Sequence, residues 1–236
     1  MVSASRSVEV HDLAGMAYAP ALEVQRAAHA EVLEWRDRAD TPIGRLYLVE
    51  HVPPVITISR RPESRQHLIA PPGALERAGV EIHETDRGGD ITYHGPGQLV
   101  VYPILDLNRL GLNLHGYMRL LEQVVIDVCS AFGVQAGRDP EATGVWVGEE
   151  GDPQRAKVCA LGIRVRRWIT MHGLALNVTT NLEHFSLIVP CGLAGRPVTS
   201  LERLLGDDCP SMDRVKQCVC ATMAGALGAE LLPARV

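Results

Sequence analysis

Apolar and polar residues alternate along the chain with two periodicities, one typical of helices and one typical of strands. The clearest helix is predicted over residues 114–132, where apolar side chains form one broad face. Gly133 follows directly and is a typical C-terminal end. Helical spacing predicts further helices over residues 20–40, 71–79, 198–205 and 212–227.

Short apolar or alternating runs between these helices predict strands. They cover residues 44–51, 55–58, 80–85, 99–105, 144–147, 157–167 and 171–178. Strands grouped between helices predict an α/β domain of the α+β type, with a mixed β-sheet flanked by helices. No internal repeat or linker divides the chain, so we expect a single domain over residues 1–236, with residues 1–8 as a disordered extension.

Composition narrows the class of protein. The chain has 236 residues, 46% of them hydrophobic and 22% charged, as in an ordinary globular domain. A net charge of -5 gives no reason to expect nucleic-acid binding. No apolar run approaches the roughly 20 residues of a membrane span, and no apolar signal core follows the N-terminus, so we expect a cytoplasmic protein without membrane association. The six cysteines show neither disulfide nor metal-ligand spacing, which predicts reduced thiols and no metal site.

The segment Arg87-Gly88-Gly89-Asp90-Ile91-Thr92-Tyr93-His94-Gly95-Pro96-Gly97 is unusually dense in glycine. Glycine allows backbone amides to approach a ligand closely, at an entropic cost in the folded chain. The segment leads into an apolar run and therefore favours a ligand-binding loop that feeds a buried strand. It matches neither the Walker A nor the dinucleotide pattern, so nucleotide binding by those modes is not expected.

Two residues are candidates for covalent chemistry. Cys191 stands between Pro190 and Gly192, which places its thiol on a turn. A thiolate is the nucleophilic form and needs a base or cation close by; the alternative is a small buried apolar side chain. Lys157 opens an apolar strand and is either a partly desolvated base or an ordinary solvated lysine at a strand end.

Other side chains leave two interpretations open. His94 and His172 each stand beside glycine and either contact a substrate or bond to the backbone. The run around Leu174 either lines a narrow apolar slot or packs in the core. Arginines 164, 166 and 167, together with 60, 61 and 65, form either a solvated face or a docking patch for an acidic partner.

Four motifs in register identify the chain as similar to a known family. They are the glycine-rich segment, Lys157-Val158-Cys159-Ala160-Leu161-Gly162, His172-Gly173-Leu174-Ala175-Leu176-Asn177 and Ile188-Val189-Pro190-Cys191-Gly192. Together they resemble the lipoyl(octanoyl) transferase family over roughly residues 20–205. The resemblance implies a catalytic domain with a fold like that of biotin and lipoate protein ligases. It also implies transfer of an octanoyl or lipoyl group from acyl carrier protein to a lysine of lipoyl domains, in 2-oxoacid dehydrogenase complexes and the H protein of the glycine cleavage system.

The resemblance also implies roles for particular residues. Cys191 carries the acyl group as a thioester, Lys157 activates it, and no cofactor takes part. Substrate-binding residues are Arg87, Gly88, Gly89, Asp90, Ile91, Thr92, Tyr93, His94, Ala160, Leu161, Gly162, His172, Gly173, Leu174 and Ala175. Three alternatives stay open: an ATP-dependent lipoate–protein ligase, a cysteine acyl-thioesterase, and a non-catalytic acyl-binding module with an inert Cys191.

Overall fold

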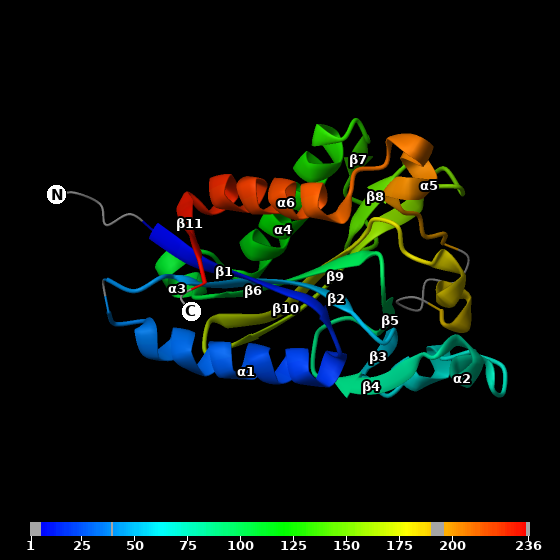
Figure 1. Cartoon of the computed structure of the whole chain (residues 1–236), viewed down its shortest axis with the longest axis horizontal. Coiled ribbons are helices and arrows are strands. Elements are labelled where there is room, and N and C mark those ends of the chain that lie inside the picture. Colours follow the sequence, from blue (N-terminus) through cyan, green and yellow to red (C-terminus); the bar gives the residue numbers. More distant parts are fainter. Residues whose placement is uncertain (1–5, 39, 190–195, 235–236) are drawn as a thin grey trace.

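Two β-sheets and the helices that cover them build the protein (Figure 1). The computed structural model describes residues 6–38, 40–189 and 196–234. Within these ranges the larger sheet has eight strands in the order β11-β1-β2-β6-β10-β9-β8-β7. Their bounds are β1 Arg6–Met16, β2 Gly44–His51, β6 Gln98–Leu105, β7 Ala136–Gly137, β8 Val145–Val147, β9 Ala156–Arg166, β10 Ile169–Asn177 and β11 Ala229–Pro233.

The direction of the strands makes this sheet mixed. Strand β1 runs parallel to both β2 and β11. From β2 across to β7, every neighbouring pair is antiparallel. The smaller sheet holds β3 (Val55–Ser59) between β4 (Glu81–Thr85), which is parallel to it, and β5 (Ile91–His94), which is antiparallel.

Helices cover both faces of the larger sheet. Helix α1 (Tyr18–Trp35) packs on one face, and α4 (Leu114–Ala131) and α6 (Met212–Leu227) pack on the other (Figure 1). The shorter helices are α2 (Ala74–Ala78), α3 (Leu107–Leu110) and α5 (Leu201–Leu205). Because both faces are covered, every residue of β6 and β10 is buried, as is typical of strands sandwiched between two layers.

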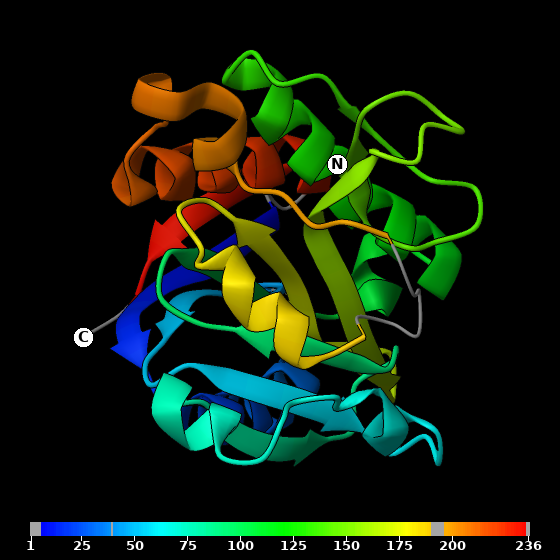
Figure 2. The same cartoon turned by 90° about the vertical axis from the view of Figure 1, so that its right-hand side faces the viewer.

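The smaller sheet packs beside α1 and has a core of its own. Ile91 and Tyr93 of β5 point into this core together with Phe185 and Leu187, from the 3₁₀ helix η2 (Leu182–Leu187). Figure 2 shows η2 (yellow) close to the smaller sheet and α2, whose residues contribute to the same core. The smaller sheet therefore presents the opposite side of β5 to the larger sheet.

The structure confirms the predicted mixed sheet flanked by helices. The helix predicted over 212–227 has these bounds as α6, and the helix predicted over 114–132 ends one residue earlier as α4. The first helix is shorter than predicted and ends at Trp35.

Three local predictions need correction. Residues 6–8 are not a disordered extension, because they begin β1 and Val8 is fully buried between β2 and β11; residues 1–5 lie outside the described residues. The helix predicted over 198–205 begins only at Leu201, since the Ser200 side chain caps it and Val198 bridges to Lys157. Part of the predicted glycine-rich loop is strand β5.

Candidate functional site

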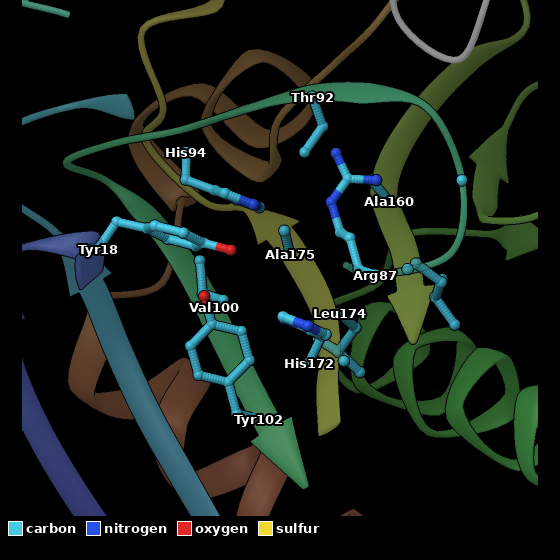
Figure 3. Close-up of a pocket in the computed structure, with 14 residues that line it drawn as sticks. Tyr18, Arg87, Thr92, His94, Val100, Tyr102, Ala160, His172, Leu174 and Ala175 are labelled. Atoms are coloured by element: carbon cyan, nitrogen blue, oxygen red, sulfur yellow. The ribbon is translucent and has the colours of Figure 1, made fainter. Parts of the chain in front are cut away.

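A cavity of about 470 Å³, including its open mouth, lies between β5 of the smaller sheet and the α1 face of the larger sheet (Figure 3). Tyr18 of α1 and Val100 and Tyr102 of β6 close one side. The rest of the lining comes from the three segments singled out in the sequence: Arg87, Gly89, Thr92, His94, Ala160, Leu161, Gly162, His172, Gly173, Leu174 and Ala175.

The glycine-rich segment contributes only alternate residues of β5 to the cavity. Thr92 and His94 face it, whereas Ile91 and Tyr93 point into the core of the smaller sheet. Asp90 is buried away from the cavity lining and pairs with His67. Gly88 is not part of the lining, and its N–H donates to the carbonyl of Ile163 over 2.8 Å. Four of the eight predicted residues in this segment therefore surround the cavity and four do not.

Strands β9 and β10 place all seven of their predicted residues around the cavity. Ala160 and Ala175 are register partners, as are Gly162 and Gly173. Gly173 has a structural reason to be glycine, because a Cβ there would lie 2.1 Å from the carbonyl oxygen of Val101. The small side chains leave a narrow space with mainly apolar walls.

Lys157 lies at the neighbouring space, which shares Thr92, Ala160 and Ala175 with the cavity. The lysine is 7% exposed, so it is a buried residue rather than a solvated strand end. Its Nζ lies 4.7 Å from the centroid of the Trp146 ring, a cation–π distance. The lysine thus lines a space that adjoins the cavity at Thr92, Ala160 and Ala175, whereas Tyr18 and Tyr102 line only the cavity.

The chain after residues 190–195 is bound to this lysine. Lys157 N–H donates to the Pro197 carbonyl, and Thr199 N–H donates to the Lys157 carbonyl, each over 2.9 Å. The Arg196 guanidinium stacks 4.0 Å from the centroid of the Trp146 ring and pairs with Asp139. Cys191, the predicted nucleophile, lies outside the described residues.

A buried chain of hydrogen bonds connects the cavity with the same stretch. Gln98 Nε2 donates to the Tyr93 carbonyl and to Asn177 Oδ1, so Gln98 Oε1 accepts from His94 Nδ1 over 2.8 Å. Asn177 Nδ2 in turn donates to the Thr199 carbonyl over 2.9 Å. Burial holds the pKa of His94 well below its ordinary value. The neutral ring therefore keeps the lone pair on Nε2, and the side chain extends into the cavity (Figure 3).

His172 is fixed in an unusual backbone conformation on the cavity wall. Its φ is +59°, a left-handed value that non-glycine residues rarely adopt. The Gln25 side chain accepts from its N–H over 2.8 Å, and Asp86 accepts from its Nε2 over 3.0 Å. Burial lowers the pKa of His172 despite the carboxylate. Burial pushes the pKa of Asp86 up, but the bond from His172 and the charge of Arg164 outweigh it and lower that pKa.

The arginines of the predicted docking patch separate into groups. Arg60, Arg61, Arg87 and Arg164 line one surface depression, and Asp86 is the acidic side chain in its lining. Arg65 instead lies near Glu84, and Arg166 and Arg167 are exposed outside that lining. The depression shares Arg87 with the cavity, so the two sites are neighbours.

Eight residues that surround the site were not predicted from the sequence as catalytic or substrate-binding residues. They are Tyr18, Gln98, Val100, Tyr102, Trp146, Asn177, Phe185 and Val198. Asn177 ends the third motif, and Gln98 directly follows the glycine-rich segment, so their position beside motif residues was a usable signal. Nothing in the local sequence around Tyr18 indicates that the first turn of α1 meets β6.

Residues 17–224 match the family described as the lipoyl protein ligase A/B catalytic domain. The chain belongs to this family. Among curated members, it is 46% identical over 199 residues to an octanoyltransferase of Solibacter usitatus, covering 84% of each chain. It is 45% identical over 218 residues to an octanoyltransferase of Gloeobacter violaceus, covering 92% of this chain and 88% of that one.

A solved structure shares the fold of this ligase A/B domain at low identity. It is a bipartite lipoate protein ligase from Thermoplasma acidophilum, with a TM-score of 0.70 and 14% identity, and it covers 98% of this chain and 87% of that chain. The predicted resemblance to the lipoate ligase fold is confirmed. Within the described ranges, no helix is long and apolar enough to cross a membrane, and no three His, Cys, Asp or Glu side chains gather as a metal site.

Proposed function

We propose that this protein is an octanoyltransferase that moves an octanoyl group from acyl carrier protein to a lysine of lipoyl-accepting domains. The identity of 45–46% to octanoyltransferases over most of the chain supports this activity. The acceptors are the lipoyl domains of 2-oxoacid dehydrogenase complexes and the H protein of the glycine cleavage system. We place the enzyme in the cytoplasm, and the free state of the five described cysteines supports a reducing compartment.

The cavity suits a short, unbranched acyl chain. Its walls carry small residues on β9 and β10, and its inner side carries Val100 and two tyrosine rings. Each methylene moved from water into such a site contributes about 0.8 kcal/mol. The acyl chain therefore lies along the cavity with its carbonyl at the Lys157 end.

The reaction proceeds in two transfers. First, the Cys191 thiol gives its proton to Lys157, its sulfur bonds to the thioester carbonyl carbon, and the bond to the phosphopantetheine sulfur breaks. The proton passes to that leaving sulfur. Then the acceptor lysine amine attacks the acyl-cysteine, the amide forms, and the Cys191 thiol is regenerated with the amine proton.

The position of Lys157 is the observation that carries this proposal. The lysine lines the space next to the acyl cavity, and its main chain is bonded to the stretch that directly follows residues 190–195. A covalent relay suits two large protein substrates, because the donor can leave before the acceptor docks.

Intact-protein mass spectrometry tests the relay. The enzyme is mixed with octanoyl-acyl carrier protein without ATP, beside a Cys191→Ala variant. We expect a gain of one octanoyl mass on the unsubstituted protein alone, discharged when a lipoyl domain is added. Transfer that appears only with ATP and free acid would instead identify a ligase. Release of free octanoate without amide product would identify a thioesterase, and unreacted protein under every condition would identify a non-catalytic acyl-binding module.

A further inference from the structure

The acyl cavity has a closed end that is distinct from its mouth. Tyr18, Val100 and Tyr102 are 2%, 1% and 3% exposed. Across the cavity, Ala160 and the neighbouring residues of β9 are only partly buried, as is Arg87. Figure 3 shows the two tyrosines and Val100 gathered on one side, away from Arg87, Thr92 and Ala160. We call Tyr18, Val100 and Tyr102 the floor.

The floor is also the end farther from Lys157. The space that contains Lys157 meets the cavity at Thr92, Ala160 and Ala175, and no floor residue belongs to that space. An acyl group whose carbonyl reacts beside Lys157 therefore directs its methyl end toward the floor.

Hydrogen bonds hold both tyrosine rings in place. The Tyr18 hydroxyl donates to Thr85 Oγ1 over 2.8 Å, which ties α1 to β4. The Tyr102 hydroxyl lies 2.7 Å from His51 Nε2, and His51 Nδ1 lies 3.0 Å from the Met16 carbonyl. The Met16 carbonyl can only accept, so His51 donates from Nδ1 and accepts the Tyr102 proton at Nε2. Burial lowers the pKa of His51 to about 4, so this arrangement persists at neutral pH.

These bonds make the floor rigid. A longer acyl chain needs one of the rings to rotate away, which would leave a buried hydroxyl or histidine without its partner. An unsatisfied buried polar group is costly, so the floor resists such movement. Val100 lies on the central strand β6, where both faces of the sheet are covered.

We propose that Tyr18, Val100 and Tyr102 set the maximum length of the acyl chain that this enzyme transfers. The inference rests on the proposed octanoyl transfer and adds the residues that determine its specificity. His51 and Thr85 are positioning residues that act through the two tyrosine rings.

The test measures kcat/KM for acyl-carrier-protein donors whose acyl chains have six to fourteen carbons. It compares variants that make the cavity deeper with a variant that makes it shallower. Tyr18→Val and Tyr102→Val deepen the cavity, and we expect the ratio of kcat/KM for dodecanoyl over octanoyl to rise about 10-fold or more. Val100→Ile adds one methylene and should favour hexanoyl over octanoyl. Tyr102→Phe keeps the ring but removes its bond to His51. We therefore expect a smaller rise of the dodecanoyl-over-octanoyl ratio than in Tyr102→Val.

Tyr117→Val is the matched control, because Tyr117 is a buried tyrosine in the cluster on the opposite face of the sheet. It should leave the chain-length ratios unchanged. Unchanged ratios in both deepened variants and in Val100→Ile, with folding verified by circular dichroism, would overturn the proposal. If the deepened variants do not fold, the hexanoyl-over-octanoyl ratio of Val100→Ile alone tests the proposal, and an unchanged ratio overturns it.

Equilibrium binding of free fatty acids of the same lengths separates this proposal from the proposed function. A shift of the preferred length in the floor variants supports the floor even if no transfer from carrier protein occurs. Transfer of octanoate with no change of preference in any variant keeps the function and refutes the floor.

Discussion

The main-chain N–H of Lys157 donates a hydrogen bond to the carbonyl of Pro197 over 2.9 Å. The Thr199 N–H donates a hydrogen bond of the same length to the Lys157 carbonyl. The lysine and the stretch after residues 190–195 are thus joined through their backbones. A change of the lysine side chain leaves this connection in place, so the chemical role of the ammonium can be tested separately from its place in the fold.

Lys157→Ala should reduce the rate of Cys191 acylation by about 100-fold or more, the usual contribution of a general base. The rate is followed by rapid-quench mass spectrometry with octanoyl-acyl carrier protein. Lys216→Ala, which removes a lysine from α6 that pairs with Asp12, is the control and should acylate normally. Near-normal acylation of Lys157→Ala would exclude this lysine as the base.

Asp139→Asn should lower the free energy of unfolding by about 3 kcal/mol, because it leaves the buried Arg155 and the stacked Arg196 without their carboxylate. Urea titration at pH 7 measures the change. The Arg196 guanidinium bonded to Asp139 lowers the pKa of that carboxyl, so the pair is ionised at this pH. The exposed Asp152→Asn, in the nearby turn, should change stability by less than about 0.5 kcal/mol. Equal effects of the two substitutions would contradict the argument.

Asn177→Leu should cost roughly 2–4 kcal/mol, because it leaves Gln98 Nε2 with one partner fewer and the Thr199 carbonyl without its side-chain donor. Chemical denaturation measures this loss. Asn108→Leu, at an exposed position of α3, makes the same chemical change without a buried network. A loss at Asn177 no greater than at Asn108 would show that the network adds little stability.

The elements with a strong local pattern were predictable from the sequence. Helices α4 and α6 carry continuous apolar faces between a capping residue and a terminal glycine or turn, which is all that their prediction requires. Strands β9 and β10 are long and apolar, so both were predicted, and the structure shows that they pair in antiparallel fashion.

Other features depend on contacts that local sequence does not encode. Strand β1 pairs in parallel with β2 and with β11, which lies more than two hundred residues away, and only its first half is well buried. The Trp146 ring makes cation–π contacts with Lys157 and Arg196, which come from different parts of the chain. No local motif therefore predicts its position in the site.

The glycine-rich segment is an intermediate case. The glycine density predicted one ligand-binding loop, and the family resemblance implied eight contact residues in it. The structure shows that β5 presents Thr92 and His94 to the cavity and Ile91 and Tyr93 to the core of the smaller sheet. The alternation of polar and apolar side chains at these four positions was visible in the sequence. Because glycine is frequent around these positions, the segment was interpreted as a loop and not as a strand.

Acidification from pH 7 to pH 5 should destabilise the protein, and His51 alone should contribute roughly 2 kcal/mol of that loss. Its folded-state pKa is about 4, below the ordinary value of 6.5, so the unfolded chain binds protons first as the pH falls. Stability is therefore lost between pH 6.5 and pH 4. His94 and His172, whose pKa values are also lowered by burial, act in the same direction. Urea titrations at both pH values measure the free energy of unfolding of the parent and of His51→Gln. This free energy should fall less with acidification in His51→Gln than in the parent. An equal fall in the two proteins would exclude this role of His51.

Arg60→Glu with Arg61→Glu should raise the KM for octanoyl-acyl carrier protein about 10-fold at low salt and weaken its dependence on salt. These exposed side chains line the depression beside the cavity, and acyl carrier proteins are acidic. Arg164 is a poorer probe, because its guanidinium pairs with Asp86, which in turn holds His172 on the cavity wall. Reversing that charge would disturb the cavity wall and the surface together.

The matched control is Arg203→Glu in α5 with Arg214→Glu in α6, which changes the net charge by the same amount away from the depression. A small donor, octanoyl-pantetheine, lacks the acidic carrier and should react equally with the parent and both double variants. If Arg60→Glu with Arg61→Glu leaves the KM for the carrier-bound donor unchanged, the carrier docks on another face. If it impairs the small donor as well, the effect comes through Arg87 and the cavity rather than through docking.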